Sequence, residues 1–236
     1  MSIAARDVPQ YAVNPPPPAL VAVADGGKPF PVHRIYCVGR NYADHAVEMG
    51  SDPEREAPFF FSKPADAVAA NKSELGYPPA TANLHHEVEL VVAIGKPMFC
   101  VDAEAALDGV FGYAVGLDMT RRDLQNAAKK LGQPWDMGKG FDQSAPCSAI
   151  HRASVIGHPE HGRIQLRVNG EIRQDGDLRS LLWTVPELIA RLSTYVHLQP
   201  GDLIFTGTPA GVGPVVAGDV LEASIEGIDT LRISYV

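Results

Sequence analysis

Short apolar runs separated by glycine and proline turns recur along the whole chain. Alternating or continuous hydrophobic positions predict strands near 34–38, 59–61, 85–94, 110–118, 163–168, 171–173, 202–206, 219–225 and 230–235. Asn169-Gly170, between two of these runs, is a strong hairpin signal. Strands and helices do not alternate regularly and no internal repeat is present. The pattern therefore indicates a strand-dominated α+β fold with few short helices.

Helical patterns are short and carry recognisable end signals. They predict helices over 42–49, after Asp102, over 120–131 and over 185–195. In the third, Thr120 is the expected N-cap with Asp123 at the capping-box position, and Gly132 ends the helix. In the last, Thr184 and Glu187 form a second capping box.

The first part of the chain differs in composition from the rest. Four consecutive prolines, Pro15 to Pro18, exclude a helix or a central strand and favour an extended arm over the surface. An apolar run and the turn at Asp25-Gly26-Gly27 then predict a short hairpin. We expect residues 1–33 to form an N-terminal arm and residues 34–236 a single domain.

Charge and cysteine content exclude several classes of protein. The chain has 236 residues and a formal net charge of −8, without a basic cluster, which argues against a nucleic-acid partner. Three scattered cysteines indicate a reducing compartment and no disulfide framework. No apolar run is long enough for a membrane span, and the first residues lack the apolar core of a signal peptide. We therefore expect a cytoplasmic protein.

Two carboxylates stand at the start of the apolar strand His85-His86-Glu87-Val88-Glu89-Leu90. Because strand side chains alternate, Glu87 and Glu89 point the same way. A strand that begins at a solvated edge would explain them without further chemistry. However, Asp118 ends another apolar strand, and three carboxylates at strand ends form an all-oxygen site suited to Mg²⁺, Mn²⁺ or Ca²⁺.

Other polar groups each have a functional and a plain structural interpretation. His45 and Glu48 are three apart on the expected helix, where they form either a catalytic dyad or a surface charge pair. Lys139 lies between two glycines, and either approaches a ligand or occupies an ordinary loop. The glycine-rich stretch over 206–213 lacks the P-loop lysine, although its backbone N–H groups could hold a carboxylate.

Taken in order, six stretches resemble the fumarylacetoacetate hydrolase family, in particular its small single-domain members. They are CVGRNYADHAVEMG, FSKPADAV, LHHEVELVVAIGK, GYAVGLDMTRRDLQ, GQPWDMGKGFD and GDLIFTGTPAGVGP. The resemblance implies a mixed β-sandwich roll, a homodimer, and Mg²⁺ or Mn²⁺ held by Glu87, Glu89 and Asp118.

The same resemblance assigns roles to further residues. It implies that His45 is a general base oriented by Glu48, on a lid that closes over the substrate. Lys139 would stabilise an enolate and contact substrate oxygens. The remaining substrate-binding positions are Gln125, Thr208 at the substrate carboxylate, Arg122 near the acyl end, and Arg40.

The implied reaction is hydrolysis of a C–C bond in a small 2,4-diketo acid (an acylpyruvate) such as fumarylpyruvate, which gives pyruvate and a carboxylic acid through an enolate. Alternatives within the family are an oxaloacetate decarboxylase, a 2-hydroxy-diene-dioate isomerase or a 2-oxo-acid hydratase. Outside it, a non-haem iron site at His85 and His86 is disfavoured because strand alternation separates them. A silent metal-binding protein would not need the pair His45 and Glu48.

Overall fold

The computed structural model describes residues 11–44 and 57–236. The predicted helix over 42–49 falls mostly outside these ranges. The larger of two main sheets contains β3 (Arg34–Gly39), β4 (Phe59–Lys63), β5 (Val68–Ala70), β8 (Val88–Ile94), β9 (Val110–Leu117), β11 (Ala145–Cys147), β12 (His151–Arg152) and β15 (Asp202–Phe205). Its order is β4-β3-β15-β8-β9-β11-β5, with β12 also paired to β9. The sheet is mixed, because β15 runs parallel to β3 and antiparallel to β8.

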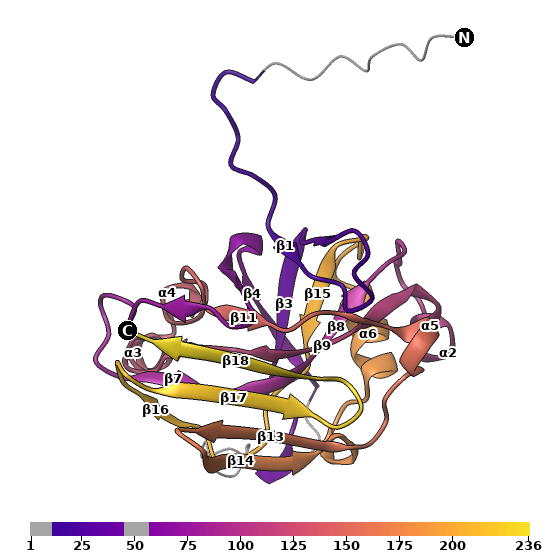
Figure 1. Ribbon diagram of the computed structural model, residues 1–236. Coiled ribbons are helices and arrows are strands. Elements are labelled where there is room, and N and C mark those ends of the chain that lie inside the picture. The colour runs from indigo at the N-terminus through magenta and orange to yellow at the C-terminus, as the bar shows by residue number, and fades with distance from the viewer. Residues whose placement is uncertain (1–10, 45–56) are drawn as a thin grey trace.

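The smaller main sheet contains β6 (Glu74–Leu75), β13 (Arg163–Val168), β14 (Glu171–Asp177), β17 (Val220–Ile225) and β18 (Asp229–Tyr235). Its order is β14-β13-β17-β18-β6, and the predicted hairpin at 169–170 joins β13 to β14. Two minor sheets consist of β1 (Leu20–Val21) with β2 (Phe30–Pro31), and of β7 (Leu84–His86) with β10 (Thr120–Arg121) and β16 (Gly213–Val215). The strands of the smaller main sheet run across those of the larger one (Figure 1).

The core fills both faces of the larger sheet. Side chains of β8 alternate between two apolar clusters: Leu90 packs toward the smaller sheet with Ile164, and Val91 packs on the other side with Phe30 of the N-terminal hairpin. All seven residues of β8 are therefore buried. This two-sided burial explains why the sequence of β8 is almost continuously apolar. The expected strand-dominated mixed sandwich is confirmed.

The α-helices of the described residues are short. They are α2 (Ala103–Ala106), α3 (Arg122–Leu131), α4 (Asp136–Lys139), α5 (Ala153–Ile156) and α6 (Val185–Ser193). Three single turns of 3₁₀ helix, η1 (Ala65–Ala67), η2 (Leu107–Gly109) and η3 (Leu178–Ser180), lie between the other elements. The capping box of Thr184 and Glu187 at α6 is confirmed.

The predicted cap of α3 is wrong. Thr120 belongs to β10, where it pairs with His85, and its hydroxyl donates to the carbonyl of Asp118. Asp123 is not a capping-box partner either, since its carboxylate accepts hydrogen bonds from the Thr81 hydroxyl and the Ala82 N–H. The tertiary contact with this loop replaces the local one, and the N-cap of α3 is Arg121, one residue later than expected.

The predicted single strand over 85–94 is also wrong, because it is two strands in different sheets. β7 ends at His86 and β8 begins at Val88, with Glu87 between them. The N–H of Val88 donates to the side-chain carbonyl of Gln174 instead of to a neighbouring strand. This side chain replaces a ladder bond at the break, and Glu87 can then turn toward the end of β9.

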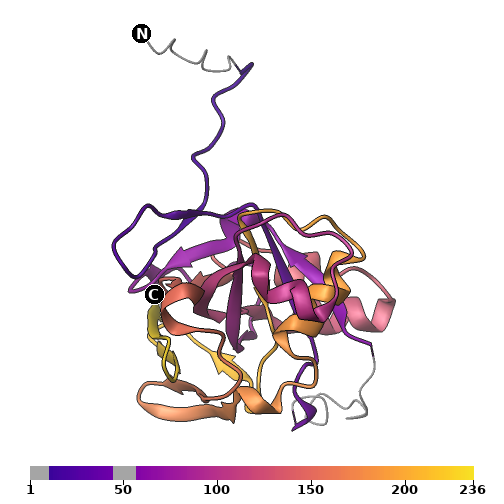
Figure 2. The same cartoon turned by 90° about the vertical axis from the view of Figure 1, so that its right-hand side faces the viewer.

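Residues 11–18 precede the hairpin and are exposed. The sequence predicted that they lie over the surface of the protein. In two perpendicular views they instead project from its body (Figures 1 and 2). Among the described residues, no helix has the length and apolar character that crossing a membrane requires.

Candidate active site

Three buried carboxylates converge where β7 ends, β8 begins and β9 ends. Glu87 lies at the break, Glu89 is the second residue of β8, and Asp118 directly follows β9. They are 5%, 1% and 1% exposed. One carboxylate oxygen from each lies within 4.8 Å of the others. The N–H of Asp118 donates to the carbonyl of Glu87 at 2.8 Å, which holds the two strand ends together.

Two buried lysines balance part of this negative charge. Lys139 Nζ donates to Glu87 Oε2 and to Asp118 Oδ2, both at 2.7 Å. Burial disfavours its charged form, but the carboxylates of Asp118 and Glu87 outweigh burial and raise the pKa of Lys139. Lys63, at the end of β4, has its Nζ 2.8 Å from Asp118 Oδ1. Lys63 also donates to the backbone carbonyls of Met119 and Lys139, which ties α4 to the larger sheet.

Glu89 has a different environment. Its Oε2 accepts the backbone N–H of Gly207 at 2.7 Å. Burial, with repulsion from Asp118 and Glu87, raises the pKa of Glu89 well above its ordinary value. Gly207 has φ +99°, and a Cβ there would lie 2.7 Å from Asn41 Cβ. Only glycine gives this backbone both the conformation and the close approach.

The residues present fit a hard divalent cation. The donor set is entirely oxygen and carries three carboxylates, the ligands that Mg²⁺, Mn²⁺ and Ca²⁺ prefer. Asp118 Oδ1 is buried and forms an ion pair with Lys63, but it accepts no hydrogen bond of good geometry from the described residues. A cation between these carboxylates would remove the repulsion that Glu89 experiences. No histidine or cysteine belongs to this cluster in the part of the chain that the structure describes.

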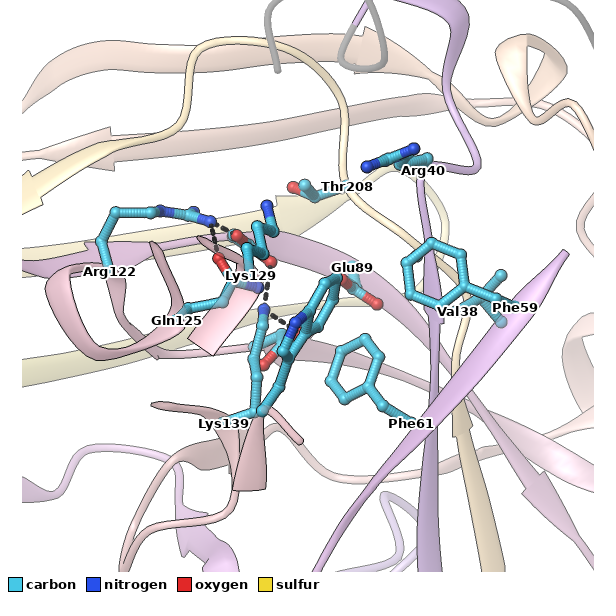
Figure 3. Close-up of a pocket in the computed structure, with 14 residues that line it drawn as sticks. Val38, Arg40, Phe59, Phe61, Glu89, Arg122, Gln125, Lys129, Lys139 and Thr208 are labelled. Atoms are coloured by element: carbon cyan, nitrogen blue, oxygen red, sulfur yellow. Dashed lines mark hydrogen bonds and ion pairs between the residues drawn. The ribbon is translucent and has the colours of Figure 1, made fainter. Parts of the chain in front are cut away.

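Basic and polar side chains form the walls of a pocket above the carboxylates (Figure 3). From α3, the guanidinium of Arg122 donates to Glu87 Oε1 and, at 2.6 Å, to Gln125 Oε1. Because Arg122 donates to the Gln125 oxygen, Gln125 can offer the N–H groups of its amide to a ligand. The carboxylates, Lys139, Arg122 and Gln125 are thus brought together, together with Thr208 and Arg40.

Gln174 was not foreseen from the sequence. It is fully buried in β14 of the other main sheet, and its amide group makes four hydrogen bonds. Its Oε1 accepts from the N–H of Val88 and pairs with His86 Nδ1, both at 3.0 Å. Its Nε2 donates to Thr208 Oγ1 at 2.7 Å and to the Pro209 carbonyl at 2.8 Å. Because Thr208 Oγ1 accepts from Gln174, its own hydrogen is available for a ligand in the pocket.

The two adjacent histidines are engaged separately. His85 Nε2 contacts Asn83 Oδ1 at 2.9 Å, whereas His86 contacts Gln174. Their different partners agree with the expectation that the two histidines lie on opposite faces of the strand and do not share a metal site. The proposed dyad, His45 and Glu48, lies outside the described residues.

Comparisons with known proteins agree on one family. Residues 34–234 match the family model described as "Fumarylacetoacetate (FAA) hydrolase C-terminal". The chain is 48% identical over 185 residues to a fumarylpyruvate hydrolase from Ralstonia sp, covering 78% of this chain and 95% of the relative. It is also 46% identical over 198 residues to "Oxaloacetate tautomerase FAHD1, mitochondrial" from Bos taurus, covering 84% of this chain and 89% of the relative.

Solved structures give the same result. The crystal structure of fumarylpyruvate hydrolase from Pseudomonas aeruginosa in complex with Mn²⁺ and pyruvate has a TM-score of 0.94 and 50% identity. The match covers 96% of this chain and 99% of that chain. A 5-carboxymethyl-2-hydroxymuconate delta-isomerase from Mycobacterium smegmatis matches with a TM-score of 0.78 and 34% identity, over 88% of this chain and 78% of that chain.

The environment of Glu89 predicts a pH-dependent cost in the metal-free protein. Its folded-state pKa lies above the ordinary 4.5, so its ionisation costs folding free energy as the pH rises above that value. In EDTA, we expect the Tm of Glu89→Gln, measured relative to the wild type, to rise between pH 5 and pH 8. In saturating Mn²⁺ the wild type should have the higher Tm, because the variant lacks one of the proposed metal ligands. Equal Mn²⁺-induced gains in the two proteins, measured by circular-dichroism melting, would contradict the metal site.

Gln174→Met tests the buried amide. The substitution keeps the size of the side chain but leaves buried partners without hydrogen bonds, so the free energy of unfolding should fall by at least about 1–3 kcal/mol. Urea denaturation measures it. Gln165→Met is the matched control, because Gln165 is also buried in the smaller main sheet but, among the described residues, accepts a single hydrogen bond, from Arg167. Losses of equal size in both variants would show that the four bonds carry no special weight.

Proposed function

Because the chain belongs to the fumarylacetoacetate hydrolase family, we propose that it is a divalent-metal-dependent hydrolase that cleaves a C–C bond in an acylpyruvate such as fumarylpyruvate. The observation that carries this proposal is the buried cluster of Glu87, Glu89 and Asp118 at the base of a pocket lined with basic side chains. The similar enzymes from Ralstonia and Pseudomonas support the choice of acyl group.

Glu87, Glu89 and Asp118 would hold Mg²⁺ or Mn²⁺, and either ion accepts three carboxylates. When bound, the cation supplies Lewis-acid stabilisation of negative charge on the keto-acid oxygens of the substrate. The Mn²⁺ and pyruvate in the Pseudomonas structure support this placement of the keto-acid half.

The side chains around the carboxylates would bind the pyruvate half. The ammonium group of Lys139 has three N–H donors, of which two go to Glu87 and Asp118. The third has no acceptor among the described residues, and it would donate to a substrate oxygen and stabilise the enolate that forms there. Thr208 would donate its hydroxyl hydrogen to the substrate carboxylate, and Gln125 its amide to an oxygen. Arg122 would orient both Glu87 and Gln125 from the acyl side.

We propose His45 as the general base and Glu48 as the group that orients its ring, on the sequence resemblance. His45 would take a proton from water, and the resulting hydroxide adds to the distal acyl carbonyl. The C–C bond to the pyruvate methylene then breaks, its electron pair remains on the pyruvate half as an enolate, and the acid leaves. Return of the proton to carbon gives pyruvate.

A second candidate is the tautomerisation of oxaloacetate, which the similarity to the Bos taurus enzyme favours at nearly the same identity. This reaction moves a proton between the enol oxygen and the carbon next to the one that bears this oxygen, and it uses the same keto-acid site. It needs no attacking water.

We further propose a cytoplasmic homodimer, with residues 1–33 as an N-terminal arm and residues 34–236 as the catalytic domain. These proposals rest on composition and on the sequence resemblance.

A substrate panel tests the function. The protein is stripped with EDTA, refilled with Mg²⁺ or Mn²⁺, and offered fumarylpyruvate, acetylpyruvate and oxaloacetate. We expect metal-dependent pyruvate release with the highest kcat/KM on an acylpyruvate. Pyruvate from oxaloacetate alone would indicate a decarboxylase. Loss of the enol absorbance of oxaloacetate without any pyruvate release would indicate the tautomerase, and no turnover at all would refute all three.

His45→Ala tests the proposed general base. Removal of a positioned base lowers turnover by roughly 10²–10⁴-fold, so kcat on the best substrate should fall by that factor. Affinity for Mn²⁺, measured by calorimetry, should not change, because His45 is not among the proposed ligands. A variant with the wild-type kcat would exclude His45 from proton transfer.

A further inference from the structure

Two cations on the wall of the pocket have no anionic partner among the described residues. Arg40, directly after β3, and Lys129, on α3, both line the pocket that contains the carboxylates. Within residues 11–44 and 57–236, neither side chain forms an ion pair. By contrast, Arg122, Lys139 and Lys63 all pair with the carboxylates.

The unpaired cations are held by aromatic rings. Phe59 and Trp135 meet edge to face, with ring centroids 5.4 Å apart and an interplanar angle of 87°. The guanidinium carbon of Arg40 is 5.8 Å from the Phe59 centroid, and Lys129 Nζ is 5.0 Å from the Trp135 centroid. A cation–π contact of this kind positions a charge without neutralising it. The charge of each cation therefore remains available to an anion.

Electrostatics point the same way. Burial, with repulsion from Arg122 and Arg40, lowers the pKa of Lys129. Lys139 adds to this repulsion, and Glu87 is the one carboxylate among the main influences that opposes it. Glu87 itself is already paired with Arg122 and Lys139. An anion beside Lys129 and Arg40 would relieve the repulsion among like charges.

The two ends of the pocket differ in what they can bind. Lys139 donates to the proposed metal ligands, whereas the tips of Lys129 and Arg40 are drawn at the opposite edge of the pocket, on the other side of Glu89 (Figure 3). A keto acid bound at the carboxylate cluster would extend its acyl chain toward that edge. A neutral acyl end would leave the two cations there without a counter-charge.

We propose that Lys129 and Arg40 select 2-oxo acids that carry a second carboxylate at the far end of the chain. This inference rests on the proposed function for the position of the keto-acid half. It narrows the substrate class to acylpyruvates with an acidic acyl group, and it gives Lys129 a role in specificity. Hydrogen bonds to charged groups contribute enough free energy for roughly 10–100-fold discrimination.

The test compares substrates in the variants Lys129→Gln and Lys129→Arg. We expect Lys129→Gln to lower kcat/KM for fumarylpyruvate by roughly 10–100-fold, mainly through KM. The kcat/KM for acetylpyruvate, whose acyl end is a methyl group, should change far less. Lys129→Arg should restore most of the loss. The matched control is Lys130→Gln, because Lys130 is an exposed neighbour on α3 that does not line the pocket.

A binding measurement separates this inference from the proposed function. Calorimetry on the Mn²⁺-loaded protein compares 2-oxoheptanedioate with 2-oxoheptanoate, which differ only in a terminal carboxylate against a methyl group. The wild type should bind the diacid more tightly, and Lys129→Gln should lose the preference. This result would support the inference even if no acylpyruvate were hydrolysed. Equal affinities in the wild type, or equal losses on both ligands in Lys129→Gln, would overturn it.

Discussion

The burial of three carboxylates within a few ångströms of one another is the constraint on which the rest of the site depends. Charged groups leave water only when they are paired. Glu87 and Asp118 satisfy this condition through Lys139, Lys63 and Arg122, which come from three separate elements. Lys63 also holds the backbone carbonyl of Lys139, so one buried lysine determines where the other lies. Within the part of the chain that the structure describes, Glu89 accepts one hydrogen bond, from the backbone N–H of Gly207, and a divalent cation would correct this imbalance.

The sandwich serves this site directly. A break between β7 and β8 is needed for Glu87 to turn toward Asp118, and a break leaves backbone groups without ladder partners. Gln174 reaches from the smaller main sheet to satisfy Val88 at the break, and its other end holds Thr208. One amide thus links the proposed metal ligands, the proposed carboxylate-binding loop and the packing of the two sheets. A fold without the second layer could not hold these loops in register.

The parts of the structure that the sequence predicted are those with a local physical signal. Position at a strand end was the signal that predicted the cluster of Glu87, Glu89 and Asp118, although the break at Glu87 was not predicted. The turn at Asn169-Gly170 and the capping box at Thr184 have their own short-range chemistry. Gln174 had no such signal, because its partners at Val88 and Thr208 are 86 and 34 positions away along the chain. Asp123 carried a misleading local signal, because its spacing from Thr120 fits a capping box. In the structure its carboxylate instead accepts a hydrogen bond from Thr81, in a loop distant along the chain. Long-range polar contacts are therefore what single-sequence reasoning missed here.

The separation between the charged ends of the pocket also bears on which reaction it favours. Hydrolysis and tautomerisation both require negative charge to be stabilised on a keto-acid group, and Lys139 can serve either. They differ in the length of the substrate. In oxaloacetate a single CH₂ group separates the keto carbon from the second carboxylate, while in fumarylpyruvate the second carboxylate lies at the end of a longer, extended chain. Arg40 and Lys129 line the same pocket as Lys139 and are drawn on the other side of Glu89, where we propose that the second carboxylate of the longer diacid binds. A short diacid would place both its charges close to the carboxylate cluster and leave the far pair uncompensated. With the roles proposed for Arg40 and Lys129, the pocket would favour the extended substrate, and with it the reaction that breaks the C–C bond between the two halves.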